Sequence, residues 1–219
     1  MYKTLKNNWA LFTGFAILAT AHGFQGNLLG VRAVIEEFNY LAVGALFSGY
    51  FLGYFVGAFY CPKLINSVGH IRTFSAFASL ASLSALIHVT FVNPSVWIFG
   101  RFLTGFSMIA IFIVTESWLN DRATNRNRGQ ILSLYMIITY VAFAAGNLLL
   151  NVSSPTKYEP FILISVLFSI ALIPILLAKK KPPKFKKTAS MCIKELYRIS
   201  PFGSFAMLCT GFIYSAVLT

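Results

Sequence analysis

The stretch SVWIFGRFLTGFSMIAIFIVT, residues 95–115, runs for 21 residues with a single charged side chain, Arg101. A helix needs about 20 mostly apolar residues to cross a bilayer, so this stretch predicts a transmembrane helix. Charged groups at membrane depth are costly and tend to mark functional pathways. One segment therefore indicates both the fold class and the first candidate functional residue.

Five further stretches resemble it in length and composition, and another apolar run ends the chain. They cover residues 9–29, 41–60, 73–91, 131–151, 161–178 and 201–219. Only 11% of the residues are charged, whereas a soluble domain carries about 25%. We predict an all-α membrane protein with a six-transmembrane-helix bundle and the start of a seventh helix.

The apolar runs divide the chain into three predicted parts. Residues 1–178 form the six-helix domain, residues 179–200 a basic cytoplasmic linker, and residues 201–219 the start of helix seven. The linker opens with KKKPPKFKK, which is typical of a solvated segment held near anionic lipid. Because the final run stays apolar to residue 219, we expect a second half to be missing from this chain.

The basic residues fix the expected orientation. Fifteen lie in segments on the side of the N-terminus, whereas only Arg32 and Lys157 lie in segments on the opposite side. Positive charges accumulate on the cytoplasmic side, so the N-terminus is predicted to be cytoplasmic. Topology also explains the net charge of +12, and no nucleic-acid partner is expected.

Three polar residues are expected to face a cavity. At 1.5 Å per residue, Gln25 lies about 24 Å along the first span and Arg101 about 9 Å below the outer surface, so their depths match. His22 shares a helix face with Gln25. We predict that Arg101, His22 and Gln25 line a cavity, although Arg101 could instead cross-link helices and His22 could be a packing residue. His88, near the outer end of its span, is expected at the membrane interface.

Small residues predict close helix packing. Gly49, Gly53 and Gly57 form a stripe on one face of the second span, and such stripes allow helices to approach closely. The missing second half is the partner we expect for this stripe. Gly105, one turn beyond Arg101, should let a neighbouring helix approach beneath the guanidinium.

Charged residues gather at the predicted cytoplasmic mouth. Arg72, Glu116, Asp121 and Arg128 could form a latch that breaks and reforms as an inner gate, or they could be solvated loop residues. Glu116 lies at the membrane edge and is expected to have an arginine partner.

Motifs of enzymes are absent from the sequence. It contains no HExxH, P-loop, GxGxxG or GxSxG motif, so we predict that the protein is not an enzyme. Cys61, Cys192 and Cys209 form no cluster with each other or with histidines. Neither a cofactor nor a metal is expected.

Several ordered motifs resemble the major facilitator superfamily, and within it the bacterial YcaD type. Besides the RxxxG that begins at Arg101, they are LGVR at 29–32, GHIR at 69–72, ESWLNDRA at 116–123 and LSLYM at 132–136. The resemblance implies a twelve-helix transporter of two halves that works by alternating access. It also implies that spans one and four line the central cavity and that span two faces the other half.

The function implied is a secondary transporter of a small solute in the bacterial inner membrane, with a proton as a candidate coupling ion. The family's acidic residue between spans two and three is absent, since Cys61 stands four residues after Gly57. Glu116 or Asp121 could substitute for it, or the latch could work differently. Two alternatives stay open: a non-transporting six-helix scaffold, and a half-size transporter acting as a homodimer.

Overall fold

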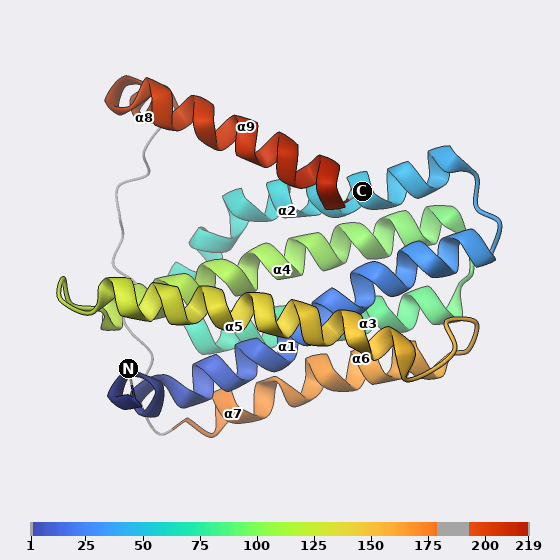
Figure 1. The fold of residues 1–219 in the computed structure, drawn as a ribbon, viewed down its shortest axis with the longest axis horizontal. Coiled ribbons are helices and arrows are strands. Elements are labelled where there is room, and N and C mark those ends of the chain that lie inside the picture. The colour runs from blue at the N-terminus through green and yellow to red at the C-terminus, as the bar shows by residue number, and fades with distance from the viewer. Residues whose placement is uncertain (1, 179–192, 219) are drawn as a thin grey trace. The chain divides into compact units, whose positions relative to one another are not determined.

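The described residues, 2–178 and 193–218, are mostly helical in this computed structural model (Figure 1). They belong to two compact units, Met1–Phe185 and Lys186–Thr219. The helices of the first unit are α1 Tyr2–Ile35, α2 Tyr40–Val68, α3 His70–Thr90, α4 Pro94–Arg122, α5 Arg128–Leu148, α6 Glu159–Ile170 and α7 Leu172–Leu176, with the 3-10 turn η1 at Leu149–Asn151. The second unit holds α8 Ile193–Ile199 and α9 Pro201–Leu218. Its boundary falls inside the predicted linker, of which residues 179–192 lie outside the described part.

Five helical segments are long and apolar enough to cross a membrane among the residues that the structure describes. They are Tyr40–Val68, His70–Thr90, Pro94–Arg122, Arg128–Asn151 and Glu159–Leu176. Helix α1 has ample length at 34 residues, but His22, Gln25 and Asn27 lower its mean hydropathy. The predicted count of six spans therefore stays a prediction.

The helices extend beyond the apolar runs because caps, not hydropathy, decide where a helix ends. The side chain of Asn39 accepts a hydrogen bond from the backbone N–H of Ala42 at the start of α2. Asn93 caps α4 in the same way, and Pro94 follows at a position where its missing N–H costs nothing. Between α2 and α3 the chain turns at Gly69, whose φ of +90° favours glycine.

The predicted sixth span is broken into α6 and α7 at residue 171. Pro174 lies in α7, and a proline ring clashes with the carbonyl four residues earlier, here that of Ile170. The helix is therefore interrupted one turn before Pro174.

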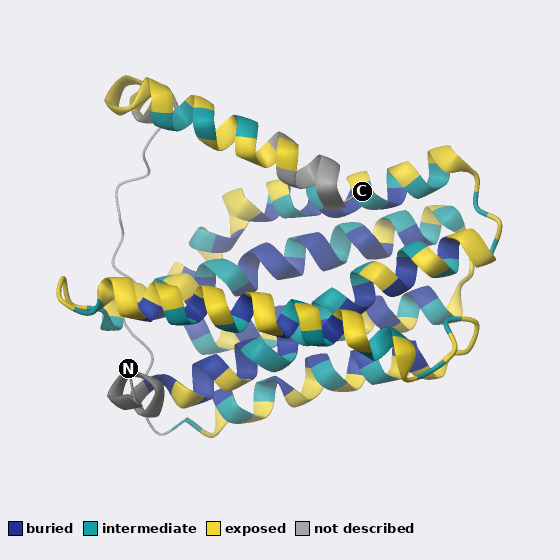
Figure 2. Ribbon diagram, viewed as in Figure 1, coloured by how far each residue is buried: buried dark blue, intermediate teal, exposed yellow. Residues whose placement is uncertain are grey.

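Helix α4 is the central helix of the first unit. Its spanning window is 61% buried, more than that of any other candidate span, and buried residues run along its length (Figure 2). It packs against α2 and α3. Gly49, Gly53 and Gly57 all lie against α4, where a Cβ on Gly49 would come within 2.9 Å of the Ile98 carbonyl oxygen. The glycine stripe thus packs inside this unit, whereas we expected a second half as its partner.

The packing follows a three-plus-three repeat. In such a repeat, α1, α2 and α3 correspond to α4, α5 and α6. The contact between α2 and α4 then corresponds to that between α5 and α1, and the contact between α3 and α4 to that between α6 and α1. The contact between α3 and α6 corresponds to itself, and all five pairs of helices are in contact. Glycines serve both equivalent contacts, because a Cβ on Gly105 would overlap the Tyr50 carbonyl and one on Gly146 would overlap the Thr20 carbonyl. Internal repeats of this kind place polar sites at the repeat interface.

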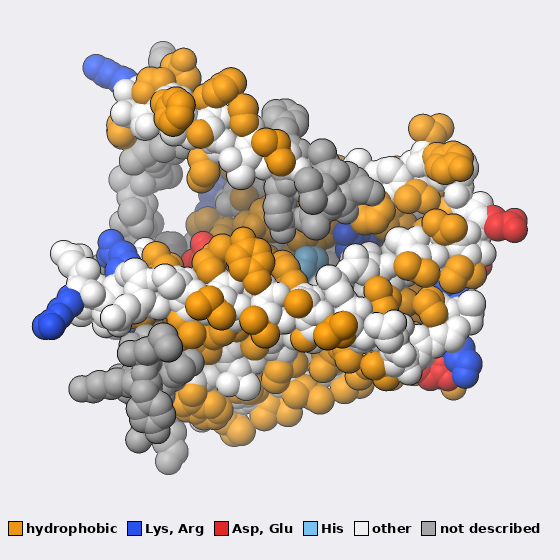
Figure 3. All heavy atoms as spheres, viewed as in Figure 1, with side chains coloured by type: hydrophobic (Ala, Val, Ile, Leu, Met, Phe, Trp, Pro, Cys, Tyr) orange, Lys and Arg blue, Asp and Glu red, His pale blue; other side chains and the backbone are white. Residues whose placement is uncertain are grey.

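The surface of the first unit fits a lipid environment. On the face drawn in Figure 3, hydrophobic side chains are spread along the length of the helices, while acidic and most basic side chains lie near the helix ends. Large apolar residues such as Phe55, Tyr140 and Leu176 are more than half exposed. In a soluble protein such exposure would mark an interaction surface, and on helices apolar enough to cross a membrane it fits contact with acyl chains.

Candidate functional site

Arg101 lies in the part of α4 that is buried among the other helices, and only 4% of it is exposed. Its guanidinium carbon lies 4.6 Å from the centre of the Tyr50 ring and 5.8 Å from that of Phe47, both on α2. Its Nε and Nη1 atoms are buried without a hydrogen-bond partner among the described residues. The α2 rings therefore hold the cation by cation–π contact and leave two donors unused.

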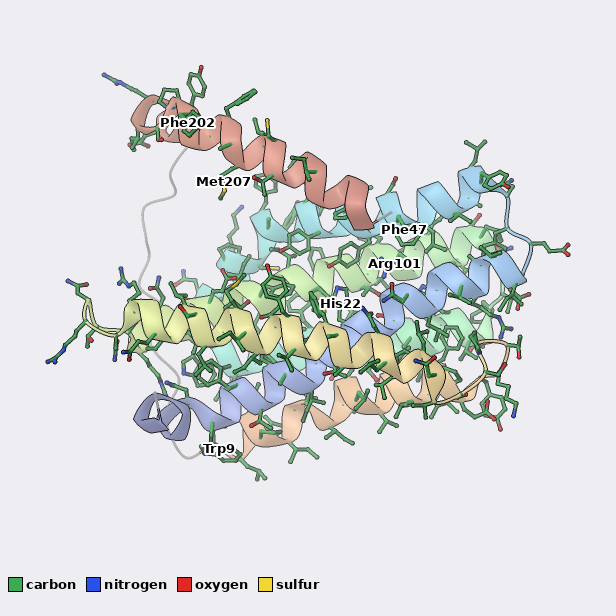
Figure 4. All side chains as sticks on the ribbon, viewed as in Figure 1. Trp9, His22, Phe47, Arg101, Phe202 and Met207 are labelled. Atoms are coloured by element: carbon green, nitrogen blue, oxygen red, sulfur yellow. The ribbon has the colours of Figure 1, made fainter. Side chains whose placement is uncertain are left out.

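His22 on α1 contacts the same tyrosine. Its Nε2 lies 3.2 Å from the Tyr50 hydroxyl, and the two rings stack with centroids 5.4 Å apart. The Nδ1 of His22 is buried and has no partner in the described part of the chain. Figure 4 shows His22 and Arg101 close together, with Phe47 beside the arginine. Tyr50 thus joins the two residues that the sequence pointed to.

Gln25, one turn further along α1, belongs to a neighbouring polar network. It is fully buried, and its Nε2 donates to Ser84 Oγ of α3 at 3.4 Å. Ser84 Oγ in turn lies 2.8 Å from Thr104 Oγ1 of α4. The Oε1 of Gln25 has no hydrogen-bond partner among described atoms. The network ties α1, α3 and α4 together within one turn of Arg101.

The sequence predicted Arg101, His22 and Gln25 but missed Tyr50, Ser84 and Thr104. Among the described residues Arg101 makes no hydrogen bond to His22 or Gln25, and Tyr50 contacts both Arg101 and His22. Tyr50 stands among many aromatic residues of its span and carries no distinguishing signal. Serine and threonine can form a hydrogen bond within their own helix, as Thr104 does with the Gly100 carbonyl. Their presence in a span is therefore no signal of a functional site.

His88 corrects the sequence-based expectation of an interfacial position. It is fully buried, its Nδ1 contacts the Ser84 carbonyl, and its Nε2 lies 3.3 Å from the Trp97 carbonyl. Its ring also lies against the position of Gly100, where a Cβ would collide with it. Because residue 100 is a glycine, the His88 ring fits against α4 and joins α3 to it.

Asn27 lies on a different face of α1, where it is exposed. Its Nδ2 donates to the Gly23 carbonyl at 3.3 Å and also contacts Oδ1 of Asn147 on α5. The pair bridges the two helices that pack through Gly23 and Gly146.

The four predicted gate residues do not form ion pairs with one another in the part of the chain that the structure describes. Arg72, Glu116, Asp121 and Arg128 are all exposed. Instead of the expected arginine, Glu116 has the hydroxyl of Tyr135, which donates to its Oε1 at 3.2 Å. Their role in a latch stays a prediction.

A different contact joins helices at the same end. Arg122 donates to Asn8 Oδ1 at 3.1 Å and lies 5.5 Å over the Trp118 ring. This contact links the end of α4 to the start of α1.

Comparison with known proteins decides the family. The model of the Major Facilitator Superfamily matches residues 11–219. The chain belongs to the Major Facilitator Superfamily. It is therefore a multi-pass membrane protein of a transporter family, and its apolar helices agree with that class.

Three similar relatives are uncharacterized transporters of this superfamily. One from Yersinia pestis (strain Pestoides F) is 31% identical over 137 residues, which are 63% of this chain and 36% of the relative. YcaD of Escherichia fergusonii is 25% identical over 209 residues, 94% of this chain and 55% of the relative. YcaD of Shigella flexneri is 28% identical over 172 residues, 77% and 44% respectively. This superfamily member thus spans about half the length of its relatives, or less, and the resemblance inferred from its motifs is confirmed.

The polar site of this superfamily member combines one charged group with neutral polar groups. It offers a cation with two unused donors, an imidazole nitrogen and an amide oxygen. No carboxylate lies in α1–α7 within ion-pair distance of Arg101 in the described residues.

Proposed function

We propose that the complete protein is a secondary transporter that moves a small solute across the bacterial cytoplasmic membrane by alternating access. The observation that carries the proposal is Arg101, buried in a multi-pass membrane protein with two guanidinium nitrogens unpartnered in the described residues. Charged residues within membrane spans are costly and usually have a function, and the polar groups around Arg101 are suited to binding a solute.

In this proposal Arg101, His22 and Gln25 are the solute-binding residues, and Tyr50 positions Arg101 and His22. Tyr50 contacts both the cation and the imidazole, so a solute that moves one side chain also moves the other. Binding of a solute at this site would therefore change how α1 packs against α2 and α4. A proton is the coupling ion proposed.

The proposed architecture is that of one half of a two-half transporter. Residues 1–178 supply six spans, with α1 as a polar, cavity-lining span, residues 179–200 a cytoplasmic linker, and residues 201–219 the start of span seven. The length of the relatives supports the proposal, since the chain covers 36–55% of three of them. The other half, or a second copy of this chain, would close the cavity.

The cytoplasmic gate is proposed to use Arg72, Glu116, Asp121 and Arg128. All four are exposed and form no ion pair with one another in the described residues, which is compatible with pairing across a closing mouth. Glycines 49, 53, 57 and 105 are proposed to keep α2 and α4 moving as one body, because their contacts are too close for relative sliding. The N-terminus is proposed to be cytoplasmic from the distribution of basic residues.

Uptake by proteoliposomes tests the transporter against the scaffold alternative. The complete gene product is reconstituted and exposed to a small-molecule extract of the cells that make it, and the retained solutes are measured by mass spectrometry. We expect accumulation above that of empty liposomes, and loss of this accumulation in Arg101→Ala. A wild-type protein that accumulates nothing in either membrane orientation would support the scaffold.

A further inference from the structure

We propose that the transported solute carries one carboxylate and that Arg101 binds it. The inference rests on the transporter role proposed above and adds the chemical class of the solute. It depends on the charge balance around Arg101, on the unpaired atoms of Arg101 and Gln25, and on the absence of a second cation from the predicted spans.

The charge balance of the first unit leaves Arg101 without a counter-ion among the described residues. The chain has six acidic residues, and each lies in a loop or near a helix end: Glu36, Glu37, Glu116, Asp121, Glu159 and Glu195. Ion pairs in the described residues do not include Arg101. An uncompensated buried charge is strongly unfavourable. An anion that arrives from outside these helices would remove that cost.

The unpaired atoms indicate hydrogen bonding as well as charge. Nε and Nη1 of Arg101 are donors without partners among the described residues, and both are screened from water. Hydrogen bonds between a guanidinium and a carboxylate are among the strongest in proteins, since both groups are charged. The rings of Tyr50 and Phe47 hold the guanidinium from α2, so little ordering is needed when the anion binds.

The number of charges favours a monoanion. Arg101 is the only lysine or arginine within the apolar runs of the six predicted spans. One cation balances one carboxylate, whereas a doubly charged phosphate would leave a net negative charge in a low-dielectric site. The unpartnered Oε1 of Gln25 is an acceptor and suits a hydroxyl or another donor on the same solute.

The competing explanation is that a carboxylate from the remainder of the protein pairs with Arg101. In that case the solute need not be an anion. The two explanations differ in the charge of the solute that the wild-type protein accumulates, so that charge is the primary readout.

The test extends the proteoliposome assay by sorting the accumulated solutes by charge. Four forms of the complete protein are compared: wild type, Arg101→Gln, Arg101→Lys and, as a control, Lys157→Gln. Lys157 is an exposed cation outside the site, so its loss should leave uptake unchanged. Arg101→Lys keeps the charge, and size-exclusion chromatography identifies any variant that fails to fold.

We expect the wild type to accumulate monocarboxylates. Uptake should fall about tenfold or more in Arg101→Gln, the size expected for losing hydrogen bonds to a charged group, and less in Arg101→Lys. Accumulation of only neutral or cationic solutes would overturn the carboxylate inference and leave the transporter proposal intact. If folded Arg101→Gln protein takes up carboxylates at the wild-type level, the role of Arg101 is overturned. If no form of the protein takes up any solute, the proposed function itself is overturned.

Discussion

The guanidinium of Arg101 on α4 lies 4.6 Å from the ring centre of Tyr50 on α2. The same ring stacks on His22 of α1 and bonds to it through its hydroxyl. Three helices thus meet at one aromatic ring. The position of the buried cation depends on the ring face, and the position of the imidazole depends on both ring and hydroxyl.

Substitutions at Tyr50 should separate these two contacts. Tyr50→Phe keeps the ring under Arg101 and removes the bond to His22, so we expect a loss of about 1 kcal/mol in the free energy of unfolding. Tyr50→Leu also removes the cation–π contact and should cost about 2–4 kcal/mol. The midpoint of thermal unfolding in detergent, followed by tryptophan fluorescence, should fall in the order wild type, Phe, Leu. Equal midpoints for the two variants would show that the ring does not stabilise Arg101.

The contact between α2 and α4 should tolerate no methyl group at Gly105. A Cβ there would overlap the Tyr50 carbonyl oxygen, so Gly105→Ala must separate the helices and should destabilise by about 1–3 kcal/mol. Gly44→Ala is the matched control on α2, since a Cβ at Gly44 meets nothing within 4 Å. The control should be neutral or stabilise by about 0.5–1 kcal/mol. Thermal midpoints in detergent measure both, and similar midpoints for the two variants would contradict the close approach.

Ser84 should matter more than its size indicates. Ser84→Ala removes the acceptor of Gln25 Nε2, which leaves a buried amide unsatisfied at a cost of about 1–3 kcal/mol, and it also removes the contact with Thr104. Ser79→Ala on the exposed side of the same helix should stay within about 0.5 kcal/mol of the wild type. Thermal unfolding of both variants checks the difference. If Ser79→Ala costs as much, the loss is a general effect of serine removal and not of this network.

Much of this architecture could be predicted from the sequence, because apolar runs such as residues 95–115 reflect the bilayer directly. Arg101 and Gln25 could be selected as candidate site residues because charge and amide groups are rare at membrane depth. Tyr50 and Ser84 could not, since tyrosine and serine are ordinary residues in spans and their partners come from other helices. The end of α2 at Val68 was also missed, because hydropathy falls near Cys61-Pro62 while the helix continues. His88 was misplaced, since sequence distance from the span end does not show that the absent side chain of Gly100 makes room for it.

The proposed orientation predicts which loops face the cytoplasm. Cysteine at Asn125, in the exposed loop between α4 and α5, should react with a membrane-impermeant maleimide only in inside-out vesicles. Cysteine at Thr156, in the exposed loop before α6, should react only in right-side-out vesicles. Gel-shift labelling of the complete protein, in a background without the native cysteines, measures both. The reverse pattern would place the N-terminus outside, against the distribution of basic residues.

Alternating access is the central claim, and cysteine at His22 tests it most directly. His22 is half-buried at the site, so in a background without the native cysteines its replacement should react with an impermeant maleimide from either face of the membrane. Cysteine at Val166, an apolar position exposed on α6, faces lipid and should stay unlabelled. We predict labelling at residue 22 in both right-side-out and inside-out vesicles. Labelling from neither side, or from one side alone, would contradict alternating access at this site.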